Sequence, residues 1–448
     1  MCMEVVEQKR LTRQQKEAVG LLSIGTFLEY FDLMLYVHMA VLLNELFFPK
    51  TDPDTASILS AFAFCSTFVF RPFGALIFGW LGDNISRKAT VVVTTSLMAF
   101  SCILMANLPT YSQIGIAASW LITICRILQG MSSVGEIVGA ELYLTEITTP
   151  PIQYPIVSFI AIFSVVGTVA ALAVASLFTS FGLNWRIAFW IGAAIAMVGA
   201  VARTTLRETP EFADAKRRLQ KKMEKAYIDH KTLEDDPIFN EKANQKTTLY
   251  LLLVNCAWPA CFYFAYVHCG NILKNSFSYN AESVIHHNLI ISIIQLVGLI
   301  TISLLSHKIY PLKILKTKLV IFSIGILMCP YLLESTDSPV YVFIIQSFIV
   351  LFAVDTVPAV SIFFKHFPVF KRFTYSSLIY AISRAMMYII TSFGIIYLTK
   401  YLGHYGLLVV IIPLNIGCAL GINHFENLEK KVGNYPQKPS LGFAPEVV

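Results

Sequence analysis

Two carboxylates stand close together in the first long apolar stretch of this chain. Glu29 and Asp32 are three residues apart and Tyr36 follows four residues later, so all three share one face of a helix. An ionised side chain at the centre of a membrane costs about 2.5–3.5 kcal/mol, so two on one face indicate a function. Neighbouring carboxylates in a low dielectric are readily protonated, which a proton carrier needs. We therefore expect Glu29 and Asp32 to bind and release protons, unless one of them only pairs with an arginine to hold helices together.

Two arginines and a group of polar residues lie in the next apolar stretches. Arg71 is twelve residues before Asp83, about 18 Å at helical rise, which places it near the middle of its stretch. A guanidinium at this depth needs a carboxylate partner or an anionic ligand. Four side chains further along fall within about 80° of arc on one helix. They predict one wall of a polar cavity that Tyr36 also faces: Arg126, Gln129, Ser133 and Glu136.

The later half of the chain has two charged residues in the middle of apolar stretches. These are Asp355 and Arg384, and we expect no others at this depth. Each needs a partner or a polar surface, because an isolated charge is costly inside a membrane. Two interpretations stay open: both residues face the cavity, or they pair with each other.

The composition indicates which elements hold these groups. Of the 448 residues, 56% are hydrophobic and 14% are charged, against roughly 45–50% and 25% in soluble proteins. Apolar stretches of about 20 residues recur, long enough to cross a hydrocarbon core about 30 Å thick as helices. Gly130, Gly135 and Gly139 favour close helix packing over ligand binding. We predict an all-α membrane protein with twelve transmembrane helices, near residues 18–43, 56–81, 89–108, 114–142, 156–181, 186–206, 248–272, 284–305, 317–334, 339–364, 374–399 and 404–423.

Lysine and arginine are unevenly distributed between the two sides of the predicted membrane domain. The side that carries both termini has 27 of them and the opposite side has four. Because basic residues are retained in the cytoplasm, both termini are predicted to be cytoplasmic. The chain then divides into a cytoplasmic arm, a six-helix half, a cytoplasmic central loop, a second six-helix half and a cytoplasmic tail: 1–17, 18–206, 207–247, 248–424 and 425–448.

Other kinds of site are not predicted. The nine cysteines are scattered singly, with neither zinc-ligand spacing nor the pairing of a disulfide framework. The histidines have no spaced metal partners either, so we expect them to serve polar packing rather than a proton relay. No phosphate-binding G-x-x-x-x-G-K-[ST] loop and no nucleophile–base pair stands out. We expect no enzyme activity, no metal, no cofactor and no nucleic-acid partner.

A charged motif ends the second predicted helix: Gly79-x-x-x-Asp83-x-x-Ser86-Arg87-Lys88. It resembles the signature of the major facilitator superfamily, with Ser86 where glycine is usual. Further matches between about residues 20 and 212 resemble the metabolite:proton symporter branch, nearest to the proline/betaine transporters. They are Glu29 with Asp32, Arg71-Pro72-Phe73-Gly74, Arg126-x-x-Gln129-Gly130, Glu136, Trp185-Arg186-Ile187 and Leu206 to Phe212.

The resemblance weakens in the later half. Phe367-Pro368-x-x-x-Arg372-Phe373 matches the branch, but Lys365 stands where the branch has glutamate. Glu146 is kept in the loop after the fourth helix, whereas the arginine usual further on is Gln153. The second copy of the charged motif is degenerate at His307 to Pro311, which puts the symmetry of gating in doubt.

The resemblance implies two six-helix halves that rock around a central solute site. Asp83 would then act as a gating latch with Arg87, Lys88 and a helix end of the other half. We expect a monomeric symporter in a bacterial inner membrane, embedded in the lipid bilayer, that carries protons and a small polar organic solute. A zwitterion such as proline or glycine betaine is the first candidate, because the predicted cavity has both signs of charge. The alternatives are a carboxylate such as 2-oxoglutarate or citrate, and a transporter-like sensor that does not translocate its solute.

Overall fold

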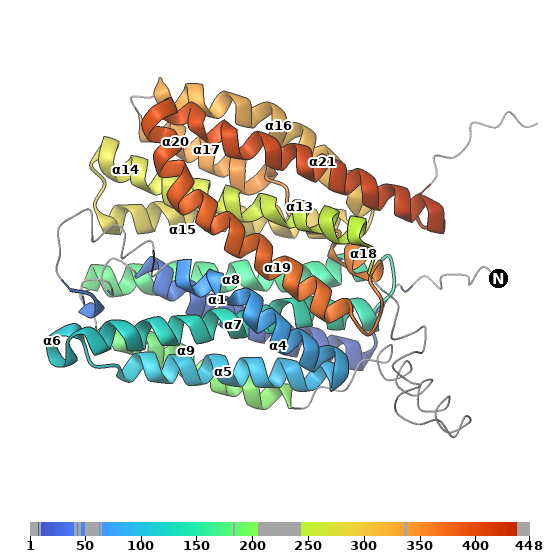
Figure 1. Ribbon diagram of the computed structural model, residues 1–448, viewed down its shortest axis with the longest axis horizontal. Coiled ribbons are helices and arrows are strands. Elements are labelled where there is room, and N and C mark those ends of the chain that lie inside the picture. Colours follow the sequence, from blue (N-terminus) through green and yellow to red (C-terminus); the bar gives the residue numbers. More distant parts are fainter. Residues whose placement is uncertain are drawn as a thin grey trace, which may run out of the picture.

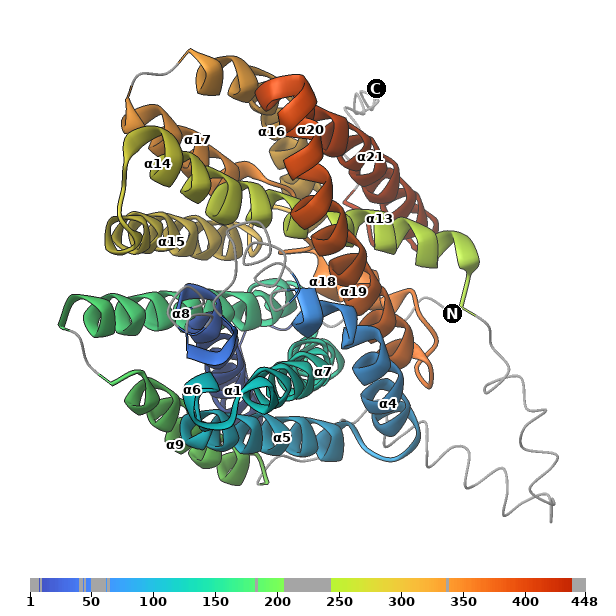
Figure 2. The same ribbon diagram turned by 60° about the vertical axis from the view of Figure 1, so that its left-hand side comes forward.

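The computed structural model describes residues 8, 10–39, 43, 46–49, 62, 65–181, 184–204, 243–335 and 338–436. Most of these residues form long helices that lie side by side in two bundles, one from each half of the chain (Figure 1). The bundles remain distinct in the view turned by 60° (Figure 2). Their helices run in broadly the same direction, so that both bundles share the same two ends.

The first bundle is built from long apolar helices joined by short connections. A helix that begins at Cys65 runs into α4 after a turn at Phe70 and continues to Asn84. The helices are α1 (Arg13–His38), α4 (Arg71–Asn84), α5 (Arg87–Asn107), α6 (Tyr111–Ile114), α7 (Ile116–Ile147), α8 (Gln153–Phe181) and α9 (Trp185–Arg203).

The second bundle contains interrupted helices. Two of them include π-helical segments, η1 and η2, and a third is broken between α17 and α18. The elements are α13 (Gln245–Phe262), η1 (Tyr263–His268), α14 (Cys269–Phe277), α15 (Ala281–Leu305), α16 (Pro311–Glu334), α17 (Pro339–Phe352), α18 (Val360–Lys365), α19 (Arg372–Ile389), η2 (Ile390–Gly394), α20 (Ile395–Leu402), η3 (Gly403–Tyr405) and α21 (Gly406–Val432).

The predicted spans overlap these helices. Within the described residues, eight helices are long and apolar enough to cross a membrane. The clearest difference concerns predicted span 339–364, which is not one helix but α17 and α18 with an irregular segment between them. Pro358 has no backbone N–H and therefore cannot continue the hydrogen-bond ladder of α17 across that segment.

Short polar residues cap the helices at their N-termini. Thr12 and Gln15 form a reciprocal capping box at the start of α1, with N···O distances of 3.2 and 2.9 Å. Ser86 caps α5, because its Oγ accepts a hydrogen bond from Ala89 N at 3.0 Å. This role explains how serine serves where glycine is usual in the charged motif.

Glycines on α7 allow close contact with its neighbours, as predicted. A Cβ atom at Gly130 would collide with the backbone of Thr67, and one at Gly135 with Thr94. A Cβ atom at Gly139 would press on the Phe373 ring of α19, so that glycine also serves the contact between the bundles. The bundles meet chiefly where α4 packs along α19 and α8 packs along α15.

The second bundle is fastened at one end by polar contacts to α21. The Tyr310 hydroxyl donates to Glu429 Oε2 at 2.6 Å, and His366 Nε2 lies 2.8 Å from Glu429 Oε1. Burial and this bond raise the pKa of Tyr310, so the phenol keeps its proton. Lys316 of α16 pairs with Glu426, one turn before Glu429. These contacts lie next to the degenerate second copy of the charged motif.

Candidate solute cavity

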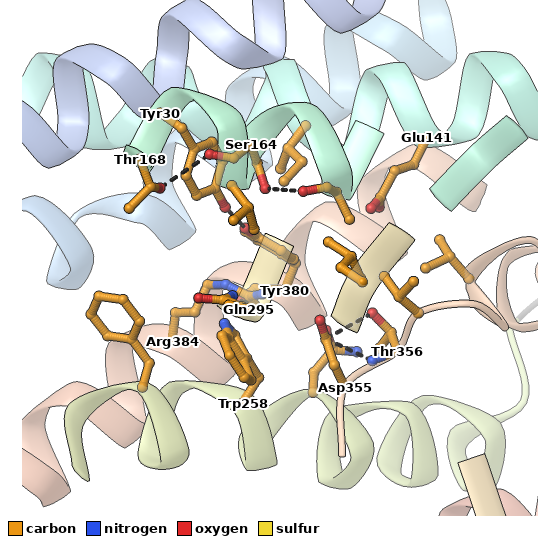
Figure 3. Close-up of a pocket in the computed structure, with 18 of the residues that line it drawn as sticks. Tyr30, Glu141, Ser164, Thr168, Trp258, Gln295, Asp355, Thr356, Tyr380 and Arg384 are labelled. Atoms are coloured by element: carbon orange, nitrogen blue, oxygen red, sulfur yellow. Dashed lines mark hydrogen bonds between the residues drawn. The ribbon is translucent and has the colours of Figure 1, made fainter. Parts of the chain in front are cut away.

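A cavity lies between the two bundles, near the middle of the long helices. Its volume of about 110 Å³ leaves room for several waters or a small organic solute. Helices α1, α4, α7 and α8 line it from the first bundle, and α13, α15, α16, α18 and α19 line it from the second. Figure 3 shows side chains from both bundles pointing into this space.

Five lysine, arginine, aspartate and glutamate residues line the cavity in the described part of the chain: Arg71, Glu141, Lys318, Asp355 and Arg384. The sequence predicted Arg71, Asp355 and Arg384 as cavity residues, and all three line it. Asp355 and Arg384 form no ion pair among the described residues, although each lies within the electrostatic influence of the other, so of the two open interpretations their place on the cavity lining agrees with the first. Glu141 and Lys318 were not predicted.

Lys318 corrects the expectation that the later half has only two mid-membrane charges. It counts among the loop residues of the sequence prediction, because it is only the second residue of the predicted helix 317–334. In the structure α16 begins at Pro311, so Lys318 lies two turns inside the helix and faces the cavity. Proline is favoured in the first helical turn, and that signal could have set the helix start earlier.

The sequence prediction does not include Glu141, because the predicted polar arc covers only one face of α7. It lies about 140° around the helix from Glu136 and about 60° from Arg126, outside the predicted polar arc. The signal available in the sequence was the position of Glu141 inside the apolar span 114–142, since a charged residue there needs a partner or a function. The structure shows that Glu141 is buried.

The charged groups occupy different depths in the cavity. Asp83, the start of α19 and the end of α7 share one end of the molecule, called the Asp83 end below. Glu141 is six residues from the end of α7 at Ile147, about 9 Å at helical rise. Arg384 is twelve residues from the start of α19, about 18 Å, and Arg71 is thirteen from the end of α4, about 20 Å. The carboxylate of Glu141 therefore lies nearer the Asp83 end than the two guanidiniums do.

A tyrosine pair joins the bundles between these levels. The hydroxyls of Tyr30 on α1 and Tyr380 on α19 are 3.1 Å apart. The Arg384 guanidinium lies over the Tyr380 ring, 3.3 Å from its centroid, which favours the cation. Figure 3 shows Gln295 beside Tyr380 and Arg384, with Trp258 next to them.

The break in the tenth predicted helix places a carboxylate beside the cavity. Asp355 lies between α17 and α18, and its Oδ1 accepts hydrogen bonds from Thr356 N at 2.6 Å and Thr356 Oγ1 at 3.3 Å. Lys318 is a charged neighbour of Asp355. Irregular backbone inside a membrane protein is tolerated where it lines a cavity, and this break fits that rule.

Four residues predicted for the cavity do not line it: Tyr36, Arg126, Gln129 and Ser133. The face of α7 that carries Arg126, Gln129 and Ser133 packs against α5 and against α1, which carries Tyr36, so all four residues lie inside the first bundle. The Arg126 guanidinium lies over the Tyr36 ring at 4.1 Å and donates to Gln129 Oε1 at 3.0 Å. The side chain of Glu136 lies outside the described residues.

The two carboxylates of α1 also face the interior of the first bundle. Asp32 is fully buried against α9 at Gly192, and neither of its oxygens has a well-aligned hydrogen bond from another described residue. The Cys102 thiol lies beside it, and Gln129 Nε2 lies 3.5 Å from Cys102 Sγ. Glu29 lines a much smaller void between α1, α5 and α7. A buried acid is thus connected to the arginine of α7 through two intervening side chains.

Asp83 contacts the N-terminus of α19 in the other bundle. Its Oδ1 and Oδ2 accept from Phe373 N at 3.1 Å and Thr374 N at 2.7 Å. The first N–H groups of a helix lack partners within it, and the helix dipole favours a negative charge there. The Arg87 side chain lies outside the described residues, and Lys88 makes no ion pair with any residue that the structure describes.

Two further contacts join the bundles at the Asp83 end. Arg372 pairs with Glu146 at 3.5 Å. Lys365 Nζ donates to Gln153 Oε1 at 2.8 Å, and the Gln153 amide donates to the backbone carbonyl of Thr145 at 2.7 Å. The two departures from the branch pattern at 153 and 365 therefore meet in one contact between the bundles.

Comparisons with known proteins agree with this architecture. A family model described as "Major Facilitator Superfamily" matches residues 22–387. The "Proline/betaine transporter" of Escherichia coli (strain K12) is 27% identical over 296 residues, 64% of this chain and 57% of its own length. The "Putative proline/betaine transporter" of Staphylococcus aureus (strain COL) is 32% identical over 208 residues, 45% of each chain. This chain thus spans about half the length of the curated relatives that it matches.

Solved structures show the same fold at low sequence identity. The proton:xylose symporter XylE bound to 6-bromo-6-deoxy-D-glucose superposes with a TM-score of 0.75 at 11% identity, over 92% of this chain and 95% of that chain. The human organic anion transporter MFSD10 gives a TM-score of 0.66 at 13% identity, over 92% of this chain and 100% of that chain.

Proposed function

Because this chain belongs to the major facilitator superfamily and is therefore a multi-pass membrane transporter rather than an enzyme, we propose that it is a proton-coupled symporter of a small zwitterionic solute. Proline and glycine betaine are the first candidates. The transporter would lie in a bacterial inner membrane with both termini in the cytoplasm, which makes the Asp83 end its cytoplasmic end. It would work as two six-helix halves, 18–206 and 248–424, that rock around the cavity.

The observation that carries this proposal is a cavity between two bundles with charges of both signs. Glu141 and Asp355 supply carboxylates, while Arg71, Lys318 and Arg384 supply cations. A zwitterion can satisfy both signs at once, whereas a sugar satisfies neither. The names of the relatives in Escherichia coli and Staphylococcus aureus, proline/betaine transporters, support the same solute class.

Proton coupling is assigned to Glu29 and Asp32. Both carboxylates are buried in the first bundle, away from the cavity, so a proton can bind there without displacing the solute. Cys102 and Gln129 connect Asp32 with Arg126, so a shift of α7 would change the field at the acid. The fold is shared with XylE, a proton:xylose symporter, which supports coupling to protons.

A carboxylate is the second candidate solute, and Arg71 favours it. Its Nε and Nη2 atoms are buried and have no hydrogen-bond partner among the described residues. Cations also outnumber carboxylates along the described lining of the cavity. A solute such as 2-oxoglutarate or citrate would supply the missing negative charge.

Counterflow in proteoliposomes tests these alternatives. The purified protein would be reconstituted, loaded with one unlabelled solute and given the same labelled solute outside, for proline, glycine betaine, 2-oxoglutarate and citrate. Zwitterion counterflow, with accumulation driven by an imposed pH gradient, is the expected result. Counterflow of the acids alone would establish the second candidate, and binding without counterflow would indicate a sensor and overturn the transport proposal.

A further inference from the structure

Glu141 is a buried carboxylate that accepts no hydrogen bond from the described residues. Its exposed fraction is 7%, it lines the cavity, and no hydrogen bond from another described residue reaches its oxygens. Its charged neighbours are Asp355, of the same sign, and Arg384. Figure 3 shows the carboxylate directed into the space between the bundles. A buried carboxylate in such surroundings is costly unless a cation reaches it.

Arg71 is a buried cation in the same cavity. It is 2% exposed, and its guanidinium lies over the Phe68 ring at 4.6 Å. Its buried Nε and Nη2 find no acceptor in the described part of the chain. Arg384 lies at a similar depth, so the guanidiniums gather at one level of the cavity and Glu141 lies at another.

Asp355 differs from Glu141 although both carboxylates line the cavity. Thr356 donates two hydrogen bonds to Asp355, and Lys318 supplies a neighbouring positive charge. The carboxylate of Asp355 is therefore hydrogen-bonded by the protein itself. Glu141 accepts no such hydrogen bond from the described residues, and it shares its positive neighbour Arg384 with Asp355, which leaves Glu141 as the carboxylate better placed to bind a ligand.

We propose that Glu141 is the residue that recognises the cationic group of the solute, and that the solute binds in one orientation. Its cation would face Glu141 toward the Asp83 end, and its anion would face Arg71 and Arg384 nearer the centre. This inference rests on the proposed zwitterion transport and specifies how the cavity selects that class. It also assigns cation recognition to a residue five positions beyond Glu136.

Two pairs of isosteric probes test the assignment. Proline is compared with cyclopentanecarboxylate, and glycine betaine with 3,3-dimethylbutanoate; in each pair carbon replaces the charged nitrogen. Competition against a labelled zwitterion in proteoliposomes gives the affinity ratio within each pair. The unmodified protein should prefer the zwitterion by about 10- to 100-fold, as a buried charge-assisted contact would give. Glu141→Gln should reduce that ratio to near one by weakening zwitterion binding, while Glu141→Asp should retain part of it.

Asp355→Asn is the matched control, because it removes the other cavity carboxylate. It should weaken both members of a pair alike and leave their ratio nearly unchanged. A ratio near one in the unmodified protein, or one that survives Glu141→Gln, would overturn the assignment while transport stands. If the unmodified protein binds no member of either pair, the proposed function itself fails and this inference with it. If Glu141→Gln does not fold, the reduced ratio expected for Glu141→Asp provides the same test.

Discussion

Asp32 is a buried acid whose connection to Arg126 runs through other side chains. Cys102 lies beside the carboxylate and Gln129 lies between Cys102 and Arg126, with contacts of 3.5 and 3.0 Å. All of these groups belong to α1, α5 and α7 of one bundle. The acid is therefore sensitive to the packing within that bundle, and it does not line the cavity.

Replacing Asp32 or Glu29 should uncouple transport from protons without stopping it. Asp32→Asn and Glu29→Gln keep the size of each side chain but remove the titrating group. Uptake of the solute against its gradient, driven by an imposed pH gradient, should then be lost. Downhill counterflow should remain within about threefold of the unmodified rate, because the cavity lining is unchanged. Uphill uptake with normal pH dependence in both variants would place the coupling site elsewhere, with Asp355 as the next candidate.

At the scale of elements, the start of α19 receives several contacts from the first bundle. Asp83 accepts from its first N–H groups, and Arg372 in its first turn pairs with Glu146. The negative charge of Asp83 complements the helix dipole, while the ion pair fixes the same turn from the other side. One helix end thus joins the two bundles at the Asp83 end.

Asp83→Asn should slow turnover but preserve solute binding. The amide oxygen can still accept one N–H of α19, but the second charge-assisted bond is lost, so we expect a fall in turnover of about tenfold. Initial rates of counterflow and equilibrium binding on the same preparation separate the two effects. The neighbouring exposed residue supplies the control, since Asn84→Ala leaves the contact with α19 intact. Loss of binding by a folded Asp83→Asn protein would show that Asp83 acts on the solute site.

The contact between Lys365 and Gln153 allows a charge-exchange experiment. The branch pattern has acid and arginine at these positions, and this chain has a lysine 2.8 Å from an amide oxygen. Gln153→Arg alone would place two cations together and should weaken closure. Adding Lys365→Glu should restore it, with a coupling between the two changes that a double-mutant cycle measures. There are two readouts: the counterflow rate, and the protection of a cysteine placed at Ser164 from a cytoplasmic thiol reagent. If the effects of the two substitutions are additive, residues 153 and 365 do not interact during transport, and the prediction is wrong.

At the scale of the whole molecule, the orientation in the membrane rests on the distribution of lysine and arginine. Single cysteines at Asn107 and Ser335 should be labelled by an impermeant reagent in intact cells. A cysteine at Asn434 should be labelled only after permeabilisation. All three positions are exposed, and the eight cysteines in the described part of the chain are buried, so the new thiols should dominate labelling. Labelling of Asn434→Cys in intact cells would show that the C-terminus lies outside and that the predicted orientation is wrong.

The helices could be predicted from the sequence because apolar length and composition are local properties. Which residues line the cavity could not be predicted from the sequence, since this depends on which face of each helix meets the other bundle. Arg126 and Gln129 share a face with Ser133 as predicted, yet that face packs inside the first bundle. The predicted start of the ninth helix, residue 317, is six residues after the observed start at Pro311, so Lys318 was placed at the N-terminal end of the helix. Glu141 lies outside the predicted polar arc of α7. Arg71 and Arg384 were found because an isolated charge in a long apolar stretch is informative without knowledge of packing.

The contacts that α21 makes with Lys316, Tyr310 and His366 have an electrical consequence. They join α16 and the residue after α18 to one helix, so Lys318 on α16 and Asp355 just before α18 are linked through α21. In the proposed rocking of the halves, this cation and anion would move together through the membrane field, and their displacement currents would cancel. A current recorded during turnover would then report the solute and its coupling ion rather than the motion of this part of the protein.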